Sequence, residues 1–369
     1  MPDLHSVALT IFLKRMASKQ LRRENIVILC EGTKTEYQYF CSIRDYLTKT
    51  NSNRFADIKV VPVESEMVIP PSKRKRRLLK PSTDGLDLSI CYYCLQEESA
   101  QLYQAYSAYP TRFVRETKLY MDRYKYTTGW AVYDHDDHPD RANAAKLADQ
   151  WGVKVAFSSR CFEQWLLSHF ERNSTIFSTS VCKDEDGRDR LCGTGVANDC
   201  HGMVCIGGRL REMRYLPDYH KNQVSRIFED YTLPRFSQCL VNVAWLNLLE
   251  AGTPYYNRTR YTNVGDLVLF LLNRNDRVEW RAMDEPFSFR GTQLCIKSDD
   301  NGIKLKNTGR NACVVRGLLT YCDSSVEPLS NALEVGMLSP EQEVTLNPVP
   351  EKATFVCMQD GQRMVVVGL

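Results

Sequence analysis

Two segments, Ile26-Val-Ile-Leu-Cys30-Glu31-Gly32 and Trp130-Ala-Val-Tyr-Asp134-His135-Asp136-Asp137, are short apolar runs that end abruptly in acidic residues. Runs of this length that are bounded in this way are typical of fully buried strands. In an open α/β sheet, ligands bind at the carboxyl ends of the strands. If the two predicted strands are neighbours, the side chains of Glu31, Asp134 and Asp136 meet at one edge of the sheet.

This acidic set predicts a metal site. Clustered carboxylates repel one another unless a cation neutralises them, and oxygen ligands of this kind suit Mg²⁺ or Mn²⁺. Asp134 and Asp136 are two residues apart, so they point to the same side while the chain stays extended. We expect both to bind metal, with Glu31 as a further ligand or as the base for an attacking water. The alternative for residues 134–137 is a solvated turn.

Further polar residues lie close to these runs in the sequence. A helix is predicted over residues 36–47, and Glu36 at its start would reach a second metal ion or orient the first ligands. Lys34 lies near the N-terminus of this helix, which is a natural seat for a substrate phosphate. Glu163 begins a later helix, where it is either a metal ligand or a carboxylate that only favours the helix dipole.

The histidines near these residues carry a weaker signal. His169 follows in an aromatic helix face, and we expect it to be a hydrogen-bonded core residue. His135 and His138 lie in the acidic loop, where they could contact a substrate, although loop histidines usually have no special role.

Strand-like and helix-like segments alternate up to about residue 172. This order predicts the α/β class, with a mostly parallel sheet covered by helices on both faces. Helical segments follow, and from about residue 280 short alternating runs with turn signals such as Asp299-Asp-Asn-Gly302 predict a β-rich module. The expected division is a lead-in at 1–24, an α/β domain at 25–275 with insertions at 64–95 and 178–210, and a β-sandwich-like module at 276–369.

The composition excludes few functions. The 369 residues are 43% hydrophobic and 25% charged, as in an ordinary soluble globular protein, and the net charge of +3 identifies no partner. No stretch approaches the roughly 18 apolar residues of a membrane span. The N-terminal run has no small-residue cleavage site, so we expect a cytoplasmic protein without a signal peptide.

The basic run Lys73-Arg-Lys-Arg-Arg77 lies in the first insertion. Its members, Arg74 and Arg76 among them, would grip the phosphate backbone of a nucleic acid, or they form a solvated loop.

The chain has 14 cysteines, and several fall in apolar segments where they behave as small hydrophobic residues. Cys91 and Cys94 have metal or redox spacing. A second group lies in a Gly-rich, polar insertion and comprises Cys182, Cys192, Cys200 and Cys205, with His201 beside them. These cysteines either hold a structural Zn²⁺ or are plain reduced thiols. Only the Cys200-x₄-Cys205 pair has a spacing close to that of a zinc knuckle.

The motifs taken together resemble a known family. Glu31-Gly-Thr-Lys-Thr-Glu36, the acidic run at 134–137, Ser158-Ser-Arg-Cys-Phe-Glu-Gln-Trp165 and the segment 257–268 are similar to the RloB-like family over roughly residues 24–275. The resemblance implies a Toprim fold, the topoisomerase–primase module that also occurs in overcoming-lysogenization-defect nucleases. It further implies association with restriction loci and phage-defence operons, often with an AAA ATPase partner.

The resemblance also implies roles for single residues. The Toprim glutamate corresponds to Glu31 and the Asp-x-Asp pair to Asp134 and Asp136. The second glutamate of the first motif corresponds to Glu36. The later Phe-Glu-x-Trp element falls on residues 162–165 and contains Glu163. The two insertions and the segment after residue 276 have no counterpart, so substrate specificity does not transfer.

These observations favour a divalent-metal-dependent nuclease that hydrolyses DNA or RNA, as an effector of antiphage defence, whether as a monomer or an oligomer. The alternative is a non-enzymatic adaptor or sensor whose C-terminal module binds a protein or nucleotide signal, because residues 305–315 look like part of an immunoglobulin-like sandwich. An adaptor has no use for a costly cluster of like charges. A primase-like reaction would share the metal site but would need a Gly-rich phosphate loop, and none is apparent.

Overall fold

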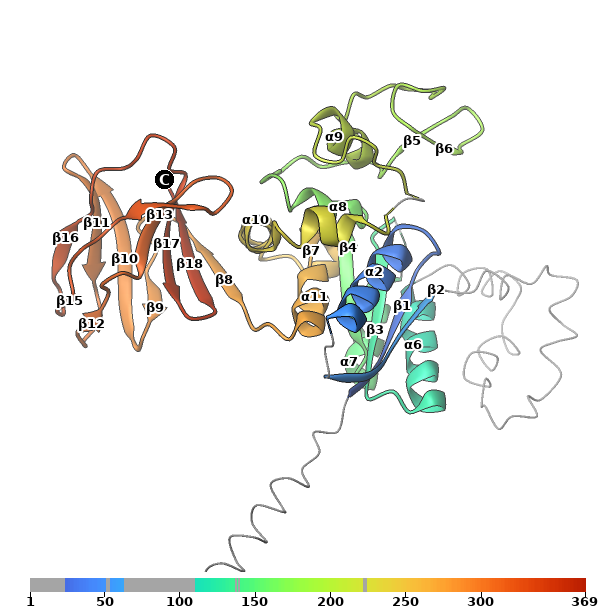
Figure 1. Cartoon of the computed structure of the whole chain (residues 1–369), viewed down its shortest axis with the longest axis horizontal. Helices are drawn as coiled ribbons and strands as arrows, with labels where there is room; N and C mark the ends of the chain where they lie inside the picture. Colours follow the sequence, from blue (N-terminus) through green and yellow to red (C-terminus); the bar gives the residue numbers. More distant parts are fainter. Residues whose placement is uncertain (1–23, 51–53, 63–109, 137, 139, 222–223) are drawn as a thin grey trace, which may run out of the picture.

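The computed structural model describes residues 24–50, 54–62, 110–136, 138, 140–221 and 224–369 (Figure 1). Its central element is a five-stranded sheet in the order β2-β1-β3-β4-β7. The first four of these strands run parallel, and the short β7 pairs with β4 in the antiparallel sense. Their bounds are β1 Glu24–Cys30, β2 Phe55–Pro62, β3 Thr128–Asp134, β4 Lys154–Ser159 and β7 Tyr261–Thr262.

Helices cover both faces of this sheet, as predicted. Because side chains alternate along a strand, Ile26, Ile28 and Cys30 pack on one face and Leu29 on the other. The first face is covered by α2 Thr35–Lys49, α8 Glu163–Leu167, α10 Phe236–Leu248 and α11 Val264–Leu272. The second face is covered by α6 Pro110–Tyr124 and α7 Arg141–Trp151.

The two acidic runs end at the same edge of the sheet because β1 and β3 are neighbours. Cys30 lies opposite Val132 in the register. The pairing continues by one further hydrogen bond, from the backbone N–H of Glu31 to the Val132 carbonyl at 2.9 Å. The carboxyl ends of both strands therefore bring Glu31 and Asp134 to one rim.

The segment between β4 and α10 is less regular than the sequence suggests. The helix that begins near Glu163 is shorter than its aromatic pattern predicts: it spans Glu163–Leu167 and ends in turns, and all five of its residues are buried. The second insertion contains β5 Cys182–Lys183, β6 Asp189–Arg190 and α9 Ile206–Glu212. A π-helical turn, η2 Phe228–Thr232, and a 3₁₀ turn, η3 Tyr255–Asn257, complete the domain.

The C-terminal part consists of mainly antiparallel sheets that lie beside the α/β domain (Figure 1). The two larger sheets have the orders β16-β11-β10-β9 and β14-β13-β17-β18-β8, and residues of both share one core, as in a sandwich. Within the second of these sheets β8 pairs with β18 in parallel, and β12 and β15 form a separate two-stranded pair. Their bounds are β8 Arg277–Arg281, β9 Phe287–Phe289, β10 Thr292–Asp299, β11 Gly302–Asn307, β12 Cys313–Val314, β13 Leu319–Cys322, β14 Pro328–Asn331, β15 Met337–Leu338, β16 Glu343–Thr345, β17 Phe355–Asp360 and β18 Arg363–Gly368.

Two features connect the sandwich to the rest of the chain. Val241 of α10 is buried in a cluster with Phe355 and Cys357 of β17. The amide of Gln238 donates to the Ser324 carbonyl at 3.2 Å. In the part of the chain that the structure describes, no helix is both long and apolar enough to cross a membrane.

Candidate functional site

Glu31 lies at the centre of the rim. Its Oε2 accepts a hydrogen bond from the backbone N–H of Asp134 at 3.0 Å, and its Oε1 lies 3.1 Å from Nε2 of His138. One ligand atom from each of Glu31, Asp136 and His138 falls within 4.8 Å of the others. These three residues form what we call the rim triad.

The path of the chain after β3 differs from our expectation. Asp134 and Asp136 do not lie on one extended strand, because β3 ends at Asp134 and Asp136 has a left-handed backbone with φ of 28°. The turn carries the Asp136 carboxylate back to the rim and also brings His138 there. Arg141 of α7 holds this turn by donating from Nη1 to the His138 carbonyl at 2.5 Å. The prediction that the two aspartates share a side as an extended pair is therefore wrong.

Asp134 itself faces the interior, with 7% of its surface exposed. Burial, followed by the charges of Glu36 and Glu31, raises the pKa of the Asp134 carboxyl well above its usual range. Burial and the charges of Glu163 and Glu31 likewise raise the pKa of Glu36 to about 8. For Asp136, burial and the charge of Glu31 raise the pKa. These mutual effects place Glu31, Glu36, Asp134, Asp136 and Glu163 in one acidic cluster.

Two further side chains, those of Tyr219 and Lys221, interact with the buried carboxylates of the cluster. Glu163 is 1% exposed, and one of its carboxylate oxygens accepts a short hydrogen bond from the hydroxyl of Tyr219. Burial alone would lower the pKa of Lys221, but the charges of Glu163 and other acidic groups raise it. Lys221 therefore stays protonated and offsets part of the negative charge. Tyr219 and Lys221 could not be predicted as site residues, because they lie in an irregular segment without periodicity.

A cavity of about 220 Å³ lies beside this cluster. Four cationic side chains and one carboxylate, Asp189, line it, with Lys34 and Lys221 on the domain side and Arg190 and Arg211 from the second insertion. Lys34 precedes α2, as predicted, and its Nζ lies 3.8 Å from the Asp189 carboxylate. The cavity therefore suits an anionic ligand next to the carboxylates.

The other candidate residues are placed as follows. Arg74, Arg76, Cys91 and Cys94 lie outside the described residues. His169 is a core residue, as expected: it is fully buried and its Nδ1 donates to the Trp165 carbonyl at 2.9 Å. The four cysteines Cys182, Cys192, Cys200 and Cys205 lie together.

His138 is the residue of the rim triad that sequence reasoning set aside. Although burial lowers the pKa of His138, the hydrogen bond and the charge of Glu31 raise it, and the net shift is upward. The one signal in the sequence was its position four residues after Asp134, in the loop that follows the strand end.

The family model described as RloB-like protein matches residues 26–271. This range contains the whole acidic cluster and stops before β8, the first strand of the C-terminal sheets. No curated protein and no solved structure matches the chain.

Proposed function

Because this chain belongs to the RloB-like family, we propose that it is a divalent-metal-dependent nuclease whose rim triad binds Mg²⁺ or Mn²⁺. The observation that carries the proposal is the convergence of one ligand atom from each of Glu31, Asp136 and His138 within 4.8 Å. Segments about a hundred residues apart in the sequence supply these atoms. The RloB-like family as such does not specify the substrate.

The residues at the rim fit such an ion. Two carboxylates and an imidazole are acceptable donors for Mn²⁺, and carboxylates are the preferred donors for Mg²⁺. Burial, and then the repulsion between nearby carboxylates, raise the pKa values of Asp134 and Glu36. A bound cation would relieve this repulsion.

The side chains of the cluster suit phosphodiester hydrolysis. A divalent ion at the rim would polarise the phosphate and lower the pKa of a bound water. Glu31 is held in one orientation by the backbone N–H of Asp134 and by His138. Glu36, with a pKa of about 8, exchanges a proton near neutral pH and so fits the role of general base or acid. Lys34 and Lys221 would attract the phosphates that flank the bond to be cleaved.

The role as an effector of antiphage defence with an AAA ATPase partner is a further proposal, which rests only on the resemblance of the motifs to this family. The alternative adaptor function would use the C-terminal sandwich as its binding module. The nuclease requires metal-dependent cleavage at the rim and the adaptor does not, so this activity distinguishes the two functions.

The test is incubation of the full chain with plasmid DNA, single-stranded DNA and total tRNA, each with Mn²⁺, with Mg²⁺ and with a chelator. We expect metal-dependent cleavage of at least one of these substrates. Mn²⁺ binding without cleavage of any substrate would support the adaptor. Absence of both binding and cleavage would remove the metal site from the proposal.

We further expect Mn²⁺ to stabilise the protein more at about pH 9 than at about pH 6. The pKa of Glu36 is raised from 4.5 in the unfolded reference to about 8 in the fold. Since the unfolded chain releases this proton first, the metal-free fold loses stability as the pH rises from 4.5 towards about 8. A cation at the cluster offsets this loss. Thermal unfolding with and without Mn²⁺ at the two pH values measures the effect.

The variant Glu36→Gln sharpens this experiment. It should raise the melting temperature of the metal-free protein at the higher pH. The further increase in melting temperature on adding Mn²⁺ should then be smaller than in the wild type. Asp45→Asn is the matched control, because Asp45 lies on the same helix but is exposed and paired with Arg44 at 2.9 Å. An unchanged Mn²⁺ gain in Glu36→Gln would contradict the place of Glu36 in the cluster.

A further inference from the structure

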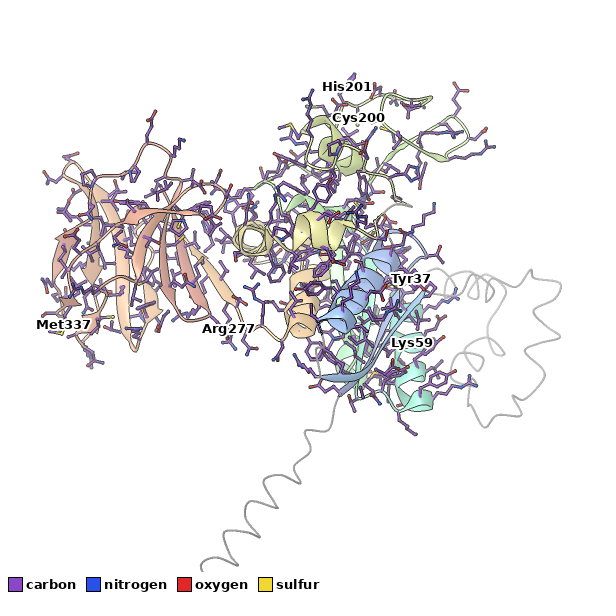
Figure 2. The ribbon with its side chains drawn as sticks, viewed as in Figure 1. Tyr37, Lys59, Cys200, His201, Arg277 and Met337 are labelled. Atoms are coloured by element: carbon purple, nitrogen blue, oxygen red, sulfur yellow. The ribbon has the colours of Figure 1, made fainter. Side chains whose placement is uncertain are left out.

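The second insertion folds around four sulfur atoms from positions that are well separated in the sequence. Sγ of Cys182 lies 3.6 Å from Cys192, 3.6 Å from Cys200 and 3.5 Å from Cys205. Sγ of Cys200 lies 3.7 Å from Cys192 and 3.2 Å from Cys205. Figure 2 labels Cys200 and its neighbour His201 on this insertion, away from the sheet. We call these residues the four-cysteine cluster.

These separations match a metal site rather than disulfides. A disulfide would bring two sulfur atoms to about 2.05 Å. Four thiolates around Zn²⁺, each about 2.3 Å from the ion, lie about 3.8 Å from one another in a tetrahedron. All four sulfur atoms are within 4.8 Å of one another, so no member is displaced from the group.

The backbone around the cluster is shaped to the sulfur atoms. Cys205 precedes α9, and its Sγ accepts a hydrogen bond from the backbone N–H of Gly208 at 3.3 Å. A side chain at Gly208 is excluded, because a Cβ would lie 2.6 Å from that sulfur. Gly202 has a left-handed φ of 72°, and a Cβ there would lie 2.7 Å from the Arg209 backbone. An N–H aimed at a sulfur atom stabilises the thiolate form that binds metal.

In the metal-free chain the Cys192 thiol donates to the Asp199 carboxylate at 2.9 Å, and this proton would leave when metal binds.

Apart from Ile206 and Leu210, which pack into the main core of the domain, the insertion has few apolar contacts. Its own hydrophobic cluster consists of cysteines plus one valine, Val196. Its two strands are two residues long, and Met203 is 71% exposed. A segment with so small an apolar core is commonly stabilised by a structural metal.

We propose that Cys182, Cys192, Cys200 and Cys205 bind one structural Zn²⁺ per chain, which fixes the insertion as one wall of the cationic cavity. Cys182 and Cys192 line that cavity together with Arg190 and Arg211. Nη2 of Arg211 donates to the Cys192 carbonyl at 3.3 Å, so the position of this arginine depends directly on a metal-binding residue. The link to the cavity rests on the proposed nuclease function, whereas the zinc site does not.

Elemental analysis of the full chain, purified without chelator, tests the zinc site. We expect one zinc per chain, and cobalt taken up in its place should show the absorption of thiolate-bound Co²⁺. Cys200→Ser should lose most of this metal. Cys313→Ser is the matched control, because Cys313 is a buried cysteine of β12 in the C-terminal sheets, and this variant should keep the metal.

A second measurement applies if Cys200→Ser does not fold. In the intact wild-type chain, alkylation followed by peptide mapping should find the four cysteines protected until zinc is chelated. Wild-type protein without zinc or cobalt, a disulfide within the cluster, or a Cys200→Ser variant with a full equivalent of metal would each overturn the proposal.

The proposed effect of zinc on the cavity is tested by a separate measurement of DNA binding. Binding of a single-stranded DNA oligonucleotide, measured with a chelator-inert fluorescent label and without Mn²⁺, should weaken at least tenfold when zinc is removed. Arg211→Gln should weaken it with zinc still bound, whereas Arg214→Gln, an exposed arginine just after α9, should not. Unchanged DNA binding after zinc loss would overturn the cavity role and leave the zinc site standing. Loss of cleavage alone would concern only the nuclease proposal.

Discussion

Replacing Glu31 by glutamine is expected to lower metal-dependent cleavage by about 10- to 100-fold, the size of effect seen when a metal site loses a supporting group. One oxygen of Glu31 accepts from the Asp134 backbone, and glutamine can keep this bond. The other oxygen faces His138 at 3.1 Å and belongs to the rim triad. An amide there cannot carry the negative charge that a divalent cation requires. Cleavage rates and Mn²⁺ affinity of the full chain measure the effect.

Glu24→Gln provides the matched control, because Glu24 begins the same strand that Glu31 follows. Its carboxylate lies 3.7 Å from Arg54 at the opposite edge of the sheet. This variant should cleave like the wild type. Asp134→Asn should behave like Glu31→Gln, with the fold intact. If Glu31→Gln retains wild-type cleavage while binding no metal, the rim triad is not the catalytic centre.

Trp165→Ala is expected to lower the free energy of unfolding by about 3–5 kcal/mol, the range for large buried aromatic residues. Trp165 is fully buried, and its ring meets His169 edge-on with centroids 4.6 Å apart. Its Nε1 donates to the hydroxyl of Tyr39 on α2 at 3.1 Å. A Cβ on Gly265 of α11 would lie 3.3 Å from the ring, so that helix also packs closely on it. Truncation therefore opens a cavity where three helices meet.

Denaturant unfolding of the full chain measures this loss. Trp151→Ala is the control, because Trp151 ends α7 and is only partly buried. We expect a loss of about 1 kcal/mol there, the usual size for a single substitution. Trp165→Phe should fall between the two, since it keeps much of the ring but loses the hydrogen bond to Tyr39. Equal losses in Trp165→Ala and Trp151→Ala would contradict the packing described.

The architecture of the α/β domain could be predicted because local patterns and tertiary structure agree there. Residues 26–30 and 130–133 are continuous apolar runs, which are typical of strands buried on both faces. The turn at Asp299–Gly302 likewise joins β10 and β11 as an antiparallel pair. In both cases the side-chain period specifies the element without help from distant residues.

The details of the site depended on information that no local pattern holds. Asp136 reaches the rim only through a left-handed turn, and an aspartate can adopt this conformation without any mark in the sequence. Lys221 is brought to the cluster by the irregular chain between α9 and η2. The spacing of the four cysteines is unlike paired knuckles, because loops rather than two hairpins bring their sulfur atoms together.

The packing of α10 has a practical consequence for dissecting the molecule. Val241 is covered by strands of the sandwich, and Arg172 stacks over Trp280 and Phe355 with its guanidinium 4.7 Å from the latter ring. A fragment that ends before β8 would expose this apolar interface to water. Such a fragment would tend to self-associate, and its aggregation in solution would reflect the exposed apolar surface rather than damage to the acidic cluster.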